Sequence, residues 1–143
     1  MDYTAAFEAD GDGFVVRFPA IPQIVTGGAA FEEAFKNAHD SLEVALLTLA
    51  SDNVELPADI ASAKGDSAAH IIHVSASVVA KLEFIAAFRQ SGLTRVALAE
   101  RLGKAETEVR RMLNPYHGTK LGMLETAIGA LGKRFVLKVE EAA

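Results

Sequence analysis

The stretch from Leu93 to Leu113 carries basic side chains around an apolar pattern, a combination that can bind a nucleic-acid duplex. Ala99 is small, Gly103 follows four residues later, and leucine, valine and methionine recur around them at helical spacing. A small residue lets a second helix pack closely, and glycine can take the left-handed conformation that turns the chain. The stretch therefore predicts a helix-turn-helix with Thr94 as N-cap. A helical hairpin with no nucleic-acid role is the alternative.

Three residues at the start of the predicted second helix, from about Glu106 to Leu113, are candidates for contacts with base edges. Glu106, Thr107 and Arg110 project together because they lie three or four positions apart. Arg110 is the best candidate for reading a guanine, and a glutamate can accept from cytosine. Since glutamate also repels phosphate, we expect either Glu106 or Glu108 to face away from the duplex.

Six further residues are candidates for phosphate contacts, which position a helix without reading the base sequence. They are Arg95, Lys104, Arg111, His117, Thr119 and Lys120. Two of these have an alternative interpretation. Arg111 could form an internal ion pair with Glu108 or Glu125, and His117 could be an ordinary loop residue.

The distribution of charge separates the chain into two parts. Its formal net charge is −5, but residues 1–80 carry three Lys and Arg against twelve Asp and Glu, a net of −9. Residues 81–143 carry eleven Lys and Arg against seven Glu, a net of +4. Two modules of opposite charge favour two different partners.

The composition excludes several classes of protein. The chain has 143 residues, half of them hydrophobic, and no cysteine, which removes disulfides, thiolate metal sites and a cysteine nucleophile. Asp10 and Asp12 fit a turn between strands, and His39 fits a surface position with no second histidine at ligand spacing. We therefore expect no catalytic residue, no metal site and no cofactor. Without a secretory signal or an apolar run long enough for a bilayer, the default is a soluble cytoplasmic protein.

The sequence predicts the element order β-β-β-α-β for the first module. Alternating apolar residues predict a hairpin over 1–20, a short strand over 24–26 and a strand over 71–74 that rejoins the sheet. A helix is expected over 31–49, with one apolar stripe that includes Phe31 and Phe35, and a long loop over 51–69. His70 and His73 would point to opposite faces of the last strand, so joint metal ligation is not expected.

The second module reads as helical. A helix over 77–90 capped by Ser77 precedes the helix-turn-helix, and a further helix from Leu121 ends near Gly132. Residues 134–139 alternate as a strand, which needs a partner edge in the first sheet or in a second chain. The fold class is thus α+β, with domains at 1–76 and 77–143.

With both modules in place, the sequence resembles the HicB family of antitoxins over nearly its whole length. The resemblance rests on seven fragments in the family's order: Gly13–Pro19, Gln23–Gly28, Glu32-Glu33-Ala34 with Asn37-Ala38, Leu98–Gly103, Val109–Leu113, His117–Lys120 and Ala130–Arg134. It implies a partial RNase H-like first domain that binds and neutralises a small ribonuclease toxin of the HicA type. It also implies a second domain that represses the toxin–antitoxin operon by binding operator double-stranded DNA, in a homodimer or tetramer.

Some positions depart from the family pattern. Lys104 stands where a small apolar residue is usual, and its stem could cover the same surface while the amine reaches a phosphate. Ala105 replaces a Ser or Asp N-cap, which weakens the start of the second helix by about 1 kcal/mol. Ala29 and Ala30 likewise replace the capping residues before the long first helix.

Two other functions compete with an antitoxin and autorepressor. One is a stand-alone helix-turn-helix transcription regulator whose N-terminal domain binds a ligand or another protein. The other is a nuclease that uses an RNase H-like first domain, which would need carboxylates converging on metal ions. The acidic residues here lie in turns, on a helix surface or in the loop, so an enzyme is not expected.

Overall fold

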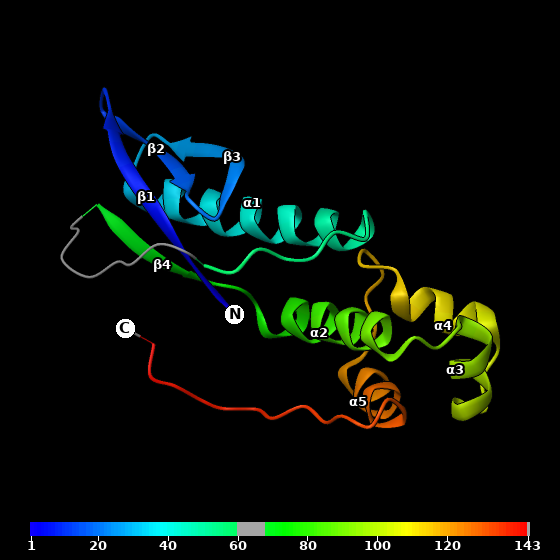
Figure 1. Ribbon diagram of the computed structural model, residues 1–143. Coiled ribbons are helices and arrows are strands. Elements are labelled where there is room, and N and C mark those ends of the chain that lie inside the picture. Colours follow the sequence, from blue (N-terminus) through cyan, green and yellow to red (C-terminus); the bar gives the residue numbers. More distant parts are fainter. Residues whose placement is uncertain (60–67, 143) are drawn as a thin grey trace. The chain divides into compact units, whose positions relative to one another are not determined.

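The computed structural model describes residues 1–59 and 68–142, and it has the α+β fold predicted from the sequence (Figure 1). Its internal contacts divide the chain into two compact units, Met1–Val79 and Ala80–Ala143. Among the described residues, no helix combines the length and the apolar character that a bilayer crossing requires. Each unit builds its own candidate surface and is described by itself below.

The first unit is a four-stranded antiparallel sheet with one long helix. The strands are β1 (Asp2–Asp10), β2 (Gly13–Phe18), β3 (Ile21–Gly28) and β4 (Ala69–His73), in the spatial order β3-β2-β1-β4. The helix α1 (Phe31–Ser51) packs against the sheet and contacts β2, β3 and β4. The predicted β-β-β-α-β order is therefore confirmed, and β4 joins the sheet by pairing with β1.

The predicted hairpin is present with a two-residue turn. Asp10 pairs with Gly13, and Gly11 between them has a φ of 60°, which glycine adopts without strain. β3 is longer than predicted, since it begins at Ile21 and includes Pro22. Proline is tolerated there because β3 lies at the edge of the sheet, where one row of backbone groups has no strand partner.

Two glycines at the end of β3 allow close approach of its neighbours. A Cβ at Gly27 would collide with the backbone oxygen of Phe14 on β2, and one at Gly28 would lie 2.6 Å from the backbone nitrogen of Ala34 on α1. The Asn37 side chain then donates to the Gly27 carbonyl at 2.8 Å. These contacts fix the first turns of α1, although Ala30 at its N-cap makes no side-chain hydrogen bond.

The buried stripe of α1 differs from the prediction at its first two turns. Ala34, Ala38, Leu42 and Leu46 are fully buried, but Phe31 and Phe35 remain exposed. The loop predicted over 51–69 carries no regular structure over 54–59, and its residues 60–67 lie outside the described residues.

The second unit contains four helices that share one apolar core. They are α2 (Ala76–Ser91), whose first residues belong to the first unit, α3 (Arg95–Leu102), α4 (Glu106–Leu113) and α5 (Leu121–Ala130). Ten buried residues form the core: Ala80, Phe84, Ala87, Leu98, Ala99, Val109, Met112, Leu124, Ala127 and Ile128. Because α2 begins at Ala76, the predicted cap Ser77 is wrong, and Ser75 is the residue that precedes the helix.

The turn between α3 and α4 agrees with the sequence pattern. Gly103 has a φ of 64° in the left-handed region, and Thr94 caps α3 by accepting from the backbone N–H of Ala97 at 3.1 Å. Ala105 makes no side-chain cap for α4, as predicted. At the end of α5, Gly132 takes the positive φ expected of a residue that ends a helix.

The predicted strand over 134–139 does not form in the single chain, so its pairing with the first sheet is wrong. Phe135 packs against the helical core, whereas Val136, Leu137 and Val139 are 80, 79 and 89 % exposed. A strand needs a partner edge, and no described strand of this chain pairs with these residues.

Candidate functional site

The exposed side of α4 carries three of the nine side chains predicted to reach a duplex. Val109 and Met112 are buried on the inner side of this eight-residue helix, while Thr107, Arg110 and Arg111 are exposed on the outer side. This separation follows from the helical period, because buried and exposed residues alternate every three to four positions. Three predicted contacts with the duplex therefore share one accessible face.

One glutamate connects two of the predicted DNA-contacting arginines. The Glu106 carboxylate lies 3.2 Å from Nε of Arg95 on α3 and 3.1 Å from Nη2 of Arg110. All three side chains retain solvent exposure, so these pairs contribute no more than about 1 kcal/mol each and a phosphate or guanine can replace them. The structure thus brings Arg95 to the Glu106–Arg110 pair, which its distance from them in the sequence did not predict.

The other two charged candidates differ in their pairing. Lys104 lies 3.7 Å from the Glu108 carboxylate, one turn along α4. Arg111 forms no ion pair with Glu108 or Glu125 in the part of the chain that the structure describes. The ion-pair alternative for Arg111 is therefore not seen here.

The loop after α4, residues 114–120, holds the remaining candidates. His117 is exposed, and its Nδ1 lies 3.3 Å from Oγ1 of Thr119. The same hydroxyl accepts a hydrogen bond of 2.7 Å from Nζ of Lys81. Lys120 is exposed and immediately precedes α5, whose first turn bonds to its carbonyl. Thr119 is only partly accessible, so it differs from the other phosphate candidates.

Lys81 is the residue of this region that sequence reasoning missed. It is 4 % exposed, and it also donates to the Met112 carbonyl at 2.7 Å. Burial disfavours the charged amine and lowers the pKa of Lys81 to about 8. The one available signal was its position in the run from Val78 to Phe88, where its helical neighbours Val78, Phe84 and Ile85 are all apolar.

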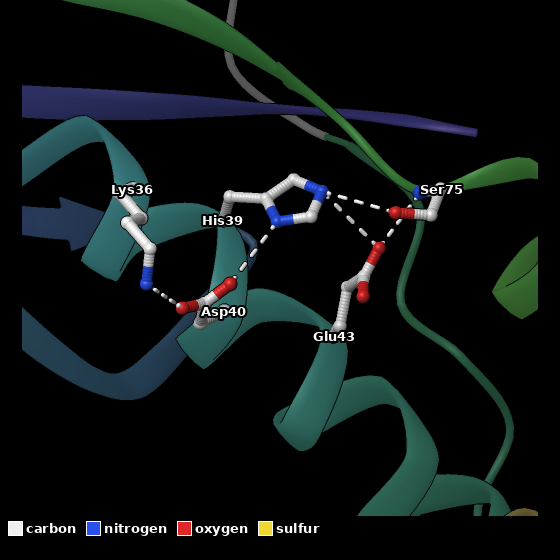
Figure 2. A network of polar contacts seen from close by, with 5 residues as sticks. All are labelled: Lys36, His39, Asp40, Glu43 and Ser75. Carbon is white, nitrogen blue, oxygen red and sulfur yellow. Dashed lines mark hydrogen bonds and ion pairs between the residues drawn. The ribbon is translucent and has the colours of Figure 1, made fainter. Parts of the chain in front are cut away.

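A polar network in the first unit involves His39, which was predicted to be a simple surface residue. Figure 2 shows its ring between Asp40 and Glu43 of α1 and Ser75, which precedes α2. The Nε2 atom lies 3.2 Å from Glu43 and 3.3 Å from the Ser75 hydroxyl, and the Ser75 N–H donates to Glu43 at 2.7 Å. His39 keeps about a third of its side chain exposed, in agreement with the surface prediction, but its network also ties Ser75 to α1, which the sequence did not predict.

Asp40 completes this network on the solvent side. Its carboxylate accepts from Lys36 at 3.1 Å and lies 3.4 Å from Nδ1 of His39 (Figure 2). Hydrogen bonds from Lys36 and His39 lower the pKa of Asp40 below its usual value. These contacts make the group a structural tether between α1 and Ser75.

Aromatic side chains gather where α1 begins. The Phe31 ring packs against Phe7 and Phe14 of the sheet, with ring centroids 5.1 and 5.9 Å apart, and against Phe35 at 6.0 Å. His70 of β4 meets Phe31 at 5.0 Å. Phe31, Glu32, Phe35 and Lys36 line a shallow hollow of about 330 Å³. We call Phe31, Phe35 and Phe14 the aromatic surface.

The described residues do not form a metal site. No group of three or more histidine, aspartate or glutamate side chains there could hold a metal ion. His70 contacts Phe7 and Phe31, whereas His73 pairs with Asp2 at 2.7 Å, so the two histidines have different partners, as expected for opposite faces. The nine predicted DNA-contacting residues and the aromatic surface therefore remain the two candidate sites.

Fold and surface together define a class of protein. The chain is an α+β protein with an acidic, sheet-containing unit that exposes aromatic rings and a basic, helical unit that exposes arginines. Such a pair of surfaces is typical of a protein that works by binding.

Comparison with known proteins identifies the family. The chain is 35 % identical over 137 residues to Antitoxin HicB 2 of Photorhabdus laumondii, which covers 96 % of this chain and 95 % of that protein. It is 36 % identical over 127 residues to Antitoxin HicB of Escherichia coli K12, covering 87 and 88 %, and 31 % identical over 122 residues to that of Pseudomonas fluorescens, covering 85 and 82 %. The chain belongs to the HicB antitoxin family, as its sequence fragments indicated.

Two solved structures are also similar. They are the N-terminal domain of Burkholderia pseudomallei antitoxin HicB, at 21 % identity, and a HicA3 and HicB3 toxin–antitoxin complex, at 20 %. Each match covers 52 % of this chain and 99 % of the other, with a TM-score of 0.45. Family membership therefore rests on the sequence relatives and not on these two structures. No protein-family model matches the chain.

Proposed function

We propose that this chain neutralises a ribonuclease toxin of the HicA type with its first unit and represses its own operon with its second. The proposal is carried by the opposite charges of the two units in a chain of this family. The formal net charge is −9 in the first unit and +4 in the second. The relatives are antitoxins by name, and the proposed functions are binding functions without catalysis.

The DNA-binding half of the proposal rests on α3 and α4. Arg95 and Arg110 meet at Glu106, and Arg111 adds an exposed positive charge on α4. In a major groove, Arg110 would leave Glu106 for a guanine, while Arg95 and Arg111 would pair with phosphates. Glu106 would then hold Arg95 in place or accept from a cytosine. The loop residues His117 and Lys120 extend the same set of phosphate contacts.

The toxin-binding half rests on the aromatic surface. A nuclease that binds RNA needs a basic substrate surface, and the acidic first unit complements it. Exposed carboxylates lie close in the chain to these rings. Glu32 and Glu33 follow Phe31 in the first turn of α1, and Asp12 at the hairpin tip lies two residues before Phe14. Exposed aromatic rings inside a charged rim are the usual anchors of a protein interface. We propose that the toxin covers this surface.

A symmetric dimer would complete the operator-binding form. One second unit offers a single recognition helix, and helix-turn-helix proteins bind paired half-sites as dimers. Residues 134–139 offer a strand without an edge in this chain, and Phe135 anchors it to the helical core. We propose that the same segments of two copies pair with each other, whether the final assembly is a dimer or a tetramer.

The experiment that tests the proposed function uses the full chain and both ligands. The product of the neighbouring reading frame is co-expressed with it, and the chain is then titrated onto duplex DNA from upstream of its own gene, with a scrambled duplex as control. The proposal expects co-purification of the neighbouring protein and preference for the upstream DNA. Preference for neither duplex would contradict the repressor, and failure to capture the neighbouring protein would contradict the antitoxin.

The C-terminal segment is tested by mass in solution. Light scattering should give the wild-type chain at least twice the 15.2 kDa of one copy, and Leu137→Asp should shift it towards one copy. The reason is that a buried carboxylate at a strand interface has no partner. A single-copy wild type, or a variant with unchanged mass, would contradict pairing through this segment.

A further inference from the structure

Lys81 is the one charged side chain among the buried residues of the described chain. Its amine has two hydrogen-bond acceptors, the Met112 carbonyl in the last turn of α4 and the Thr119 hydroxyl in the loop after it, each at 2.7 Å. Both acceptors are neutral. Burying an ammonium group without a carboxylate is costly, so its presence calls for a function other than stability.

The two acceptors connect Lys81 to the candidate DNA surface. The carbonyl groups in the last turn of a helix lack partners within the helix and carry its negative dipole end, which suits a cation. Thr119 in turn lies 3.3 Å from Nδ1 of His117. One buried amine thus joins the end of the exposed helix to the loop that carries His117 and Lys120.

We propose that Lys81 is a positioning residue for operator binding, which fixes the loop 114–120 against the end of α4 without touching DNA itself. This inference rests on the proposed DNA-binding function of the second unit. It explains why Thr119, although partly covered, belongs with the phosphate candidates. Its hydroxyl is held by Lys81 and can orient the His117 ring toward the duplex.

The alternative is that Lys81 merely fills the core, and substitution with methionine separates the two roles. Methionine has a similar length and no charge, so the variant Lys81→Met keeps the packing and removes both hydrogen bonds. The matched control is Lys133→Met, which removes a charge from an exposed lysine of the same unit whose amine donates to Gln90 at 2.8 Å. Thr119→Val removes the hydroxyl that accepts from Lys81 and lies beside His117, and Thr119→Ser retains it.

The experiment measures operator affinity, thermal unfolding and toxin capture for each full-length variant. We expect Lys81→Met to weaken operator binding about tenfold or more, the change expected when a charge-assisted hydrogen bond is lost. Lys133→Met should change it by less than about threefold, because it removes only a peripheral charge. The melting temperature and toxin capture of Lys81→Met should stay near those of the wild type.

Coupling between the two positions gives a second measurement. If Lys81 acts through Thr119, the double variant Lys81→Met with Thr119→Val should lose less affinity than the product of the two single losses. Thr119→Ser should retain most of the affinity. If Lys81→Met unfolds, the comparison of Thr119→Val with Thr119→Ser still tests the connection, since these variants change only the partly exposed loop.

Several outcomes would overturn the inference. Equal losses of operator affinity for Lys81→Met and Lys133→Met would mean that Lys81 contributes only its charge. Independent effects of substitutions at positions 81 and 119 would show that Lys81 does not act through Thr119. A large fall in melting temperature with normal binding by Thr119→Val would make Lys81 a core residue. Wild-type protein that binds no operator would remove the proposed function itself, a result distinct from all of these.

Discussion

The two units of this chain solve the same problem, presenting a binding surface, in opposite ways. The first unit buries its aliphatic residues between sheet and helix, leaves Phe31 and Phe35 39 and 36 % exposed, and ties its polar residues to one another around His39. The second unit buries a lysine and leaves its arginines outside. Apolar exposure suits a protein partner, whereas exposed guanidinium groups suit phosphates and bases, so each surface indicates a different partner.

The largest effect is expected from reversing charge at the centre of the basic surface. Arg110→Glu should weaken operator binding about 100-fold or more, because it loses a bidentate contact and adds repulsion from phosphate. Toxin capture should be unchanged, since Arg110 lies on the other unit. Fluorescence anisotropy with operator DNA and co-purification measure the two activities. Loss of both in a folded variant would break the division between the units.

The next effect concerns the aromatic surface. Phe31→Asp should weaken toxin binding about 30-fold, the loss typical of an aromatic anchor at an interface, and leave operator binding unchanged. Val44→Asp is the matched control, because Val44 is 61 % exposed on the same helix and lies outside the aromatic surface. Calorimetric titration of the toxin distinguishes them. Equal losses at both positions would show that the helix, rather than this surface, matters.

A smaller effect follows from the buried lysine. The pKa of Lys81 is about 8 when folded against 10.5 as its ordinary value, so between these pH values the folded protein binds fewer protons than the unfolded one. The contribution of this residue to the free energy of unfolding therefore rises with pH across that window. We expect the free energy of unfolding of the wild type, minus that of Lys81→Met, to be larger at about pH 9.5 than at about pH 7.5 when both are measured by urea unfolding. An equal difference at both pH values would contradict the shifted pKa.

The smallest effect is expected at the cap of α3. Thr94→Ala removes the side-chain acceptor of the Ala97 N–H and should reduce the free energy of unfolding by about 1 kcal/mol. Operator affinity should change little, because Thr94 only starts the helix. Thermal unfolding of the variant beside Thr94→Ser, which keeps a hydroxyl, provides the measurement. A loss with serine as large as that with alanine would contradict the capping role.

Local features of this structure could be predicted from the sequence. The hairpin, the left-handed Gly103, the Thr94 cap and the uncapped Ala105 all depend on residues within a few positions of one another. The burial of Leu98, Val109 and Met112 followed from helical spacing. Family membership followed from the order of short fragments, each of which was weak alone.

Several features that depend on long-range contacts could not be predicted. Helical spacing placed Phe31 and Phe35 in the core, but it cannot show which turns of α1 are covered by the sheet. His39 meets Ser75, 36 positions away, and Lys81 is of a residue type that is rarely buried. The strand over 134–139 failed for a related reason, since alternation predicts a strand but not the edge it pairs with.

The most direct test of the account is the salt dependence of operator binding by the full-length chain. An acidic protein with a net charge of −5 should bind DNA through its basic second unit alone. If Arg95, Lys104, Arg111 and Lys120 contact phosphates, the logarithm of the affinity should fall linearly and steeply with the logarithm of salt concentration between about 50 and 200 mM. An affinity that is independent of salt, or no binding at the lowest salt, would contradict the account.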